Sequence, residues 1–191
     1  KETAPRMKEM FRSIGIENGM LFMQCKIEND VPYVYDIGYR LTGSLEYKNI
    51  KESCGFDPLD MLIRFAVSGD YGEPDLASKI DPYLGGGYSF NVSMLSKPGK
   101  IAELRGIEEV RAMPQVIDVY VAHPAGDEIT EKMKGLLAQI TVRVLGKADS
   151  IDEMKQLIAD INSTIRIIST EGEELQLPGI EESDYADCIY A

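Results

Sequence analysis

The chain has 191 residues, of which 44% are hydrophobic, and its formal net charge at pH 7 is -12. This length fits one large or two small globular domains. The acidity argues against binding to a nucleic-acid backbone or to an anionic membrane surface, and no apolar run is long enough to span a bilayer. The three cysteines lack the spacing of a metal site, which indicates reduced thiols in a cytoplasmic protein.

The N-terminal region predicts a short helix followed by a β-hairpin. Residues 5–13 place apolar side chains at helical spacing. Residues 20–27 and 33–39 are rich in alternating apolar and aromatic side chains, which is typical of strands. Residues 28–30 contain Asn and Asp, which tolerate the backbone conformations of a tight turn.

The predicted hairpin gathers polar side chains on one face. Gln24 and Asp36 lie twelve positions apart, so the two strands can bring them together. Arg40 has the same parity as Asp36 and can share that face. Polar groups placed just before a Gly-containing loop could hold a metal and a phosphate. The competing interpretation is an ordinary surface ion pair, which contributes little to stability.

Further helical signals follow the hairpin. A helix is expected to begin at Asp57, with Pro58 in its first turn, and to end near Gly69. Its buried stripe is expected to consist of apolar residues at helical spacing, namely Leu59, Leu62, Ile63 and Ala66. The glycines at 85–87 form no phosphate-binding motif and favour a flexible connection between domains.

The second half predicts an α+β fold, with a mainly antiparallel sheet and helices packed on it. We expect residues 96–99 to form the turn of a hairpin, Ser150 and Glu153 to form a capping box, and the strands to extend the sheet of the first half. The expected strands are 88–95, 101–104, 116–121, 139–147 and 165–170, and the expected helices are 107–113 and 150–162.

Three segments organise the chain in this interpretation. Residues 1–84 carry the hairpin and its helices, and residues 85–178 form the α+β sheet region. Residues 179–191 form an acidic tail, which is either solvated or docked through its tyrosines and isoleucines. Because the chain begins with Lys, we expect it to be a piece of a longer protein.

The hairpin and the loop after it resemble the end of the ATP-grasp ligase active site. The text Asp36-Ile-Gly-Tyr-Arg40, followed by Leu-Thr-Gly43-Ser44, is similar to the family pattern of Glu-x-Asn-x-Arg and a Leu-Gly-Gly-like loop. The family also has a carboxylate on the preceding strand, at a position that matches Gln24 here. The resemblance implies that this chain is the C-terminal part of an ATP-grasp fold.

The resemblance also implies roles for individual residues. Asp36 would bridge two magnesium ions, with Gln24 as a second metal ligand, and Arg40 would steady the transferred phosphoryl group. Lys26 would lie at the nucleotide. Gly43 and Ser44 would offer backbone N–H groups to the phosphate.

The implied activity is that of an ATP-dependent carboxylate–amine ligase of the amino-acid-ligase or carbamoyl-phosphate-synthase-like branch. Such an enzyme uses ATP and Mg2+ (or Mn2+), passes through an acyl-phosphate and releases ADP and Pi. Its partners are small-molecule carboxylates and amines, a homodimer is left open, and this portion alone is expected to be inactive.

Two alternatives are kept. The first is a catalytically degenerate ATP-grasp-like binding or regulatory module, which is favoured by Gln24, Lys26 and Gly38 at positions where the family has other residues. The second is an independent ferredoxin-like interaction domain over residues 88–177.

Overall fold

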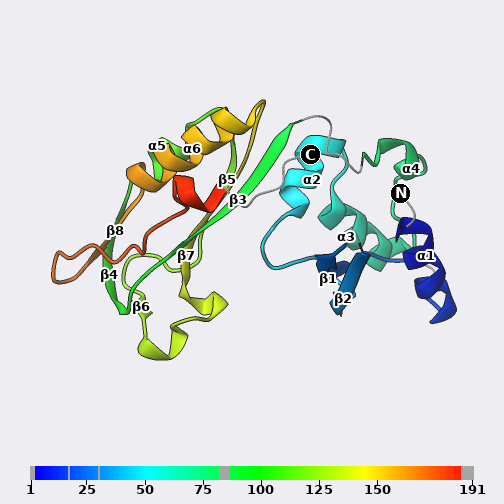
Figure 1. The fold of residues 1–191 in the computed structure, drawn as a ribbon, viewed down its shortest axis with the longest axis horizontal. Helices are drawn as coiled ribbons and strands as arrows, with labels where there is room; N and C mark the ends of the chain where they lie inside the picture. Colours follow the sequence, from blue (N-terminus) through cyan, green and yellow to red (C-terminus); the bar gives the residue numbers. More distant parts are fainter. Residues whose placement is uncertain (1–2, 17, 30, 82–86, 186–191) are drawn as a thin grey trace. The chain divides into compact units, whose positions relative to one another are not determined.

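The chain forms two compact units, Lys1–Ile80 and Asp81–Ala191, called unit 1 and unit 2 below (Figure 1). The computed structural model describes residues 3–16, 18–29, 31–81 and 87–185. Both units combine helices with antiparallel strands, so the predicted α+β class is confirmed. The glycines at 85 and 86 of the proposed connection lie outside the described residues.

Unit 1 contains the predicted hairpin. Strands β1 and β2 pair with each other in a two-stranded antiparallel sheet, and Asn29 in the turn has a positive φ of 51°. The helices and strands of unit 1 are α1 (Thr3–Ser13), β1 (Phe22–Glu28), β2 (Val31–Gly38), α2 (Tyr47–Cys54), α3 (Pro58–Ser68) and α4 (Leu76–Lys79).

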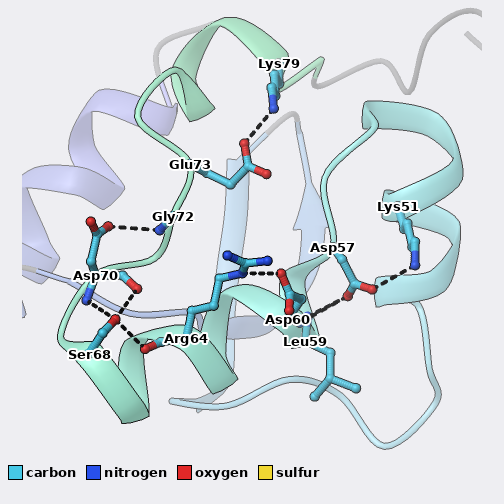
Figure 2. Close-up of polar contacts among 10 residues, drawn as sticks. All are labelled: Lys51, Asp57, Leu59, Asp60, Arg64, Ser68, Asp70, Gly72, Glu73 and Lys79. Carbon is cyan, nitrogen blue, oxygen red and sulfur yellow. Dashed lines mark hydrogen bonds and ion pairs between the residues drawn. The ribbon is translucent and has the colours of Figure 1, made fainter.

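Helix α3 begins as predicted. The Oδ1 atom of Asp57 accepts hydrogen bonds from the backbone N–H groups of Leu59 (3.0 Å) and Asp60 (3.3 Å), which otherwise have no partner in the first turn. The same carboxylate pairs with Lys51 of α2 at 3.0 Å (Figure 2). Asp57 therefore fixes the start of α3 and joins it to α2. The helix ends at Gly69, whose φ is 76°.

Replacing Asp57 by Ala is expected to destabilise unit 1 by about 1–2 kcal/mol, because the cap is lost. Burial raises the pKa of this carboxyl, but its hydrogen bonds with Lys51 and with the N–H groups of Asp60 and Leu59 outweigh that effect. Its pKa in the folded chain is therefore below the ordinary value of 3.8. A lowered pKa stabilises the fold above the pKa of the unfolded chain, and this contribution disappears as the pH falls through the folded-state pKa.

Urea unfolding of the wild type and of Asp57→Ala at several pH values measures both effects. The difference in stability between the two chains should be present at pH 7 and should shrink as the medium becomes acidic. A difference that stays constant into acid would show that the carboxylate charge has no role in the cap.

The expected buried stripe of α3 is wrong. Met61 is buried, whereas Leu59 and Ile63 are exposed and Val67 is 84% exposed. The hairpin exposes apolar side chains too, since Ile27 is 68% and Tyr35 is 71% exposed. Within the described residues, unit 1 therefore leaves uncovered much of the apolar surface that its sequence pattern would bury.

Unit 2 contains two three-stranded antiparallel sheets, ordered β3-β7-β5 and β6-β4-β8 (Figure 1). Helices α5 and α6 contact each other and pack on the first sheet. The elements are β3 (Tyr88–Leu95), β4 (Gly99–Arg105), α5 (Ile107–Arg111), β5 (Val116–Val121), β6 (Glu128–Ile129), η2 (Glu131–Met133), η3 (Leu137–Gln139), β7 (Ile140–Ala148), α6 (Ile151–Thr164), β8 (Arg166–Ser169) and η4 (Glu182–Tyr185).

One expectation about this topology is wrong. The segment 96–99 does not close a hairpin, because β3 pairs with β7 whereas β4 pairs with β6 and β8. The extension of the first-half sheet by these strands stays a prediction. Alternation along each strand was visible in the sequence, but alternation does not identify the partner strand.

Buried polar side chains explain why the chain turns between the two sheets of unit 2. The hydroxyl of Ser96 lies 2.7 Å from that of Thr141, and both residues are buried. The buried Gln139 amide donates to the carbonyl of Ser96 at 2.9 Å and accepts from the N–H of Gly135 at 2.8 Å. These bonds satisfy the polar groups of the corner and fix the end of β3 against the start of β7.

The core of unit 2 follows the predicted pattern more closely. Phe90, Val92 and Met94 alternate into the core from β3. Helix α6 buries Met154, Leu157, Ile158 and Ile161, which recur at helical spacing. Ser150 caps the helix by accepting from the N–H of Glu153 at 3.1 Å, whereas the Glu153 carboxylate accepts from Asp149. The capping box is thus present with its second bond moved by one residue.

The described part of the acidic tail is docked. Tyr185 packs against the core of unit 2, and Nζ of Lys155 lies 4.9 Å from the centre of its ring. Residues 186–191 lie outside the described residues. No helix in the described ranges combines the length and the apolarity needed to cross a membrane.

Candidate functional site

The register of the hairpin places two of the predicted site residues opposite each other. Gln24 of β1 pairs with Asp36 of β2, and directly opposite residues of an antiparallel pair point to the same face. The register then shifts, because Cys25 pairs with Val34 and leaves Tyr35 as an extra residue. A bulge of this kind bends the strand and redirects nearby side chains. The predicted juxtaposition of Gln24 and Asp36 is therefore present.

Both side chains are exposed and available to a ligand. In the described part of the chain, the side chains of Gln24 and Asp36 make no hydrogen bond or ion pair with another residue. Lys26 lies two residues along β1 on the same face, opposite Tyr33, and is also exposed. The face thus offers a carboxylate, an amide oxygen and an ammonium group in a row.

This donor set fits magnesium in one of its ordinary binding modes. Mg2+ keeps several waters and is commonly held by one or two carboxylates together with substrate phosphates. Asp36 supplies one carboxylate and Gln24 one amide oxygen. No group of three His, Cys, Asp or Glu side chains able to hold a metal occurs among the described residues. A phosphate-bearing ligand would therefore have to complete the coordination.

Arg40 lies just beyond the end of β2 and has defined contacts. Its Nη1 atom donates to the carbonyl of Leu41 at 2.9 Å. Its Cζ atom lies 4.9 Å from the centre of the Phe22 ring, within the range of a cation–π interaction. Phe22 pairs with Gly38 across the hairpin, and this is the next pair on the same face after that of Gln24 and Asp36. The guanidinium is therefore held at the end of the polar face.

The loop after Arg40 holds the remaining predicted residues. Gly43 is exposed, and a Cβ built on it would meet no atom within 4 Å. Ser44 is half-buried, and Leu45 has a positive φ of 70°. Thr42 donates from its hydroxyl to the carboxylate of Glu46, which links the two ends of this loop. The loop follows the hairpin directly in sequence, and its role toward phosphate stays a prediction.

Sequence reasoning missed Phe22 as part of this site. The available signal was the alternation of side chains along a strand. Phe22 is two residues from Gln24, and Gly38 is two residues from Asp36, so each pair shares a face of the hairpin. The bulge at Tyr35 had no sequence signal.

The single histidine has a structural role in unit 2, as His123 lies within hydrogen-bond distance of Asp127 (3.2 Å) and of the carbonyl of Ala138 (2.9 Å).

Comparisons with known proteins agree on one family of folds. Residues 93–169, within unit 2, match the family described as L-amino acid ligase C-terminal domain 2. The chain is similar to the solved structure of L-amino acid ligase from Bacillus licheniformis, with 19% identity and a TM-score of 0.68 over 88% of this chain and 42% of that one.

A second solved structure gives the same result. It is phosphoribosylglycinamide synthetase from Anaerococcus prevotii, with 14% identity and a TM-score of 0.71 over 86% of this chain and 40% of that one. No curated protein matches the chain. The chain spans about two fifths of the length of these solved structures. It has the fold of the C-terminal portion of ATP-grasp ligases, and its residues 93–169 match the model of L-amino acid ligase C-terminal domain 2.

Proposed function

We propose that the chain is the C-terminal portion of a cytoplasmic, ATP-dependent ligase that joins a small-molecule carboxylate, such as that of an amino acid, to an amine. The observation that carries this proposal is the pairing of Gln24 with Asp36 on an exposed face of the hairpin, with Arg40 at its end. The similarity in fold to L-amino acid ligase supports the choice of substrates.

Each residue of the face has a role in this proposal. Asp36 and Gln24 would hold Mg2+, which would neutralise charge on the phosphates of ATP. Arg40 pairs its planar guanidinium with the oxygens of the transferred phosphoryl group, where it stays charged at any physiological pH. Lys26 contacts the nucleotide, and the N–H groups near Gly43 and Ser44 donate to phosphate oxygens.

The proposed reaction has two steps, a phosphoryl transfer and an acyl transfer. A carboxylate oxygen of the substrate forms a bond to the γ-phosphorus, the bond between that phosphorus and the β–γ bridging oxygen breaks, and ADP leaves. The amine nitrogen then forms a bond to the acyl carbon, loses a proton and expels inorganic phosphate. The chain's own contribution is to position the groups and to stabilise the charge that develops on the phosphoryl oxygens.

The exposed apolar surface of unit 1 also supports the proposal that this chain is part of a larger enzyme. Ile63 and Tyr35 are 55% and 71% exposed, and large exposed apolar areas usually mark a contact surface. In the proposed ligase, further chain covers this surface and supplies the remainder of the nucleotide site. We therefore expect turnover from the full-length enzyme and none from the 191-residue chain alone.

ADP release by the full-length enzyme tests the proposal. The assay supplies Mg-ATP with pools of L-amino acids and simple amines, and hydroxylamine traps any acyl-phosphate as a hydroxamate. The expected result is substrate-dependent ADP and phosphate with hydroxamate formation. Release of AMP and pyrophosphate, or no nucleotide consumption with any pool, would contradict it.

A catalytically degenerate binding module is the second candidate. Gly38 offers no ligand, and the residue paired with Asp36 is an uncharged Gln24 rather than a second carboxylate. Full-length protein that binds Mg-ATP without turnover in any substrate pool would favour this alternative over the ligase.

A further inference from the structure

The ring of Phe22 lies directly against Gly38 across the hairpin. A Cβ built on Gly38 would lie 2.0 Å from Cε1 and 2.4 Å from Cζ of Phe22. Two carbon atoms do not approach so closely, so the ring of Phe22 occupies the space that a side chain at position 38 would need. A side chain at position 38 would therefore displace the ring of Phe22.

The same ring also supports Arg40. The guanidinium carbon lies 4.9 Å from the ring centre, and the hydrogen bond from Nη1 to the carbonyl of Leu41 limits the rotation of the side chain. The guanidinium has three N–H-bearing nitrogens, and this bond occupies only Nη1. The nitrogens Nε and Nη2 are thus left to donate to oxygens of a ligand.

We infer that Phe22 is a positioning residue that holds Arg40 at the phosphate end of the hairpin, and that Gly38 makes room for it. This inference rests on the proposed function for its catalytic consequence, but its geometry can be tested without turnover. Phe22 pairs with Gly38, and Gln24 with Asp36, so the ring lies one step from the proposed metal ligands on the same face. Arg40 thereby keeps a fixed orientation beside them before substrate arrives, which lowers the ordering cost of binding the phosphoryl group.

Nuclear magnetic resonance of the 191-residue chain tests the geometry. The ring current of Phe22 should displace the Arg40 side-chain resonances in the wild type. Phe22→Tyr should keep this displacement and Phe22→Leu should abolish it. Gly38→Ala should also abolish it, because the new Cβ expels the ring. Unchanged Arg40 resonances in both Phe22→Leu and Gly38→Ala would overturn the inference, whatever the activity of the protein.

Steady-state kinetics of the full-length enzyme test the consequence. Phe22→Leu and Gly38→Ala should each lower kcat at least tenfold, with the KM for ATP changed less than threefold, because Arg40 acts on the transferred group. Phe22→Tyr should retain kcat, and the double variant should lose no more than either single variant. Phe65→Leu is the matched control, since Phe65 is an aromatic residue of the same unit that stacks on Tyr71 rather than on Arg40.

The outcomes separate this inference from the proposed function. An active wild type with equal kcat values for Phe22→Leu and Phe22→Tyr would overturn the positioning role and leave the ligase intact. A wild type without turnover would remove the proposed function, and the resonances of Arg40 would still decide whether Phe22 orients it.

Discussion

Replacing Gly106 by Ala is expected to destabilise unit 2 by about 2–5 kcal/mol, from backbone strain and overpacking together. Gly106 precedes α5 with a φ of +77°, a conformation that L side chains rarely adopt. A Cβ at this position would lie 2.1 Å from the carbonyl oxygen of Thr164, the last residue of α6. Because the obstacle is backbone, it cannot turn aside as a side chain could.

Gly172 provides a matched control for this substitution. Its φ of +82° is nearly the same, but a Cβ there would meet no atom within 4 Å. Gly172→Ala should therefore cost only the backbone strain, about 1–2 kcal/mol. Native-state hydrogen exchange of the buried strand β7 reports the opening of unit 2 in both variants. Equal losses of protection would show that α5 and α6 do not meet as closely as described.

Replacing Arg40 by Lys is expected to lower kcat of the full-length enzyme by roughly 10²–10³, the usual effect of removing one preorganised donor from a transition state. Lysine keeps the charge but has neither the planar fork nor the face that stacks on Phe22. The loss should fall on kcat more than on the KM for ATP, because the lost contact forms mainly with the transferred group.

Arg64 is the matched control for Arg40. It belongs to the same unit, is exposed and pairs with Asp60 on α3 (Figure 2). Exposed pairs of this kind contribute little to stability, so Arg64→Lys should leave turnover unchanged. Similar losses from Arg40→Lys and Arg64→Lys would contradict a specific role for Arg40.

The sequence was most informative where a local rule decides the structure. The caps at Asp57 and Ser150, and the alternating core residues of β3, follow from the chemistry of neighbouring residues alone. The hairpin of β1 and β2 was also predictable, because its turn is short and its strands are adjacent in sequence. Its tight turn then fixed the approximate pairing of Gln24 with Asp36.

The errors concern contacts between distant segments. The turn at 96–99 has the composition of a hairpin turn. The buried hydroxyls of Ser96 and Thr141, which are 45 positions apart, instead meet at the end of β3, and β4 pairs with β8 in another sheet. The support of Arg40 by Phe22 depends on a close approach at Gly38, and the glycine alone gave no sign of what fills its space. Such features depend on tertiary packing, which sequence periodicity does not report.

The most direct test of the account is ADP release by the full-length enzyme carrying Asp36→Asn. This change keeps the size of the side chain and removes the carboxylate that the register places directly opposite Gln24. The account predicts at least a hundredfold loss of substrate-dependent ADP release, about 2.7 kcal/mol of transition-state stabilisation. The matched change Asp60→Asn on α3 should have no such effect. Equal activity in wild type and Asp36→Asn would contradict the placement of the metal and phosphate site on the hairpin.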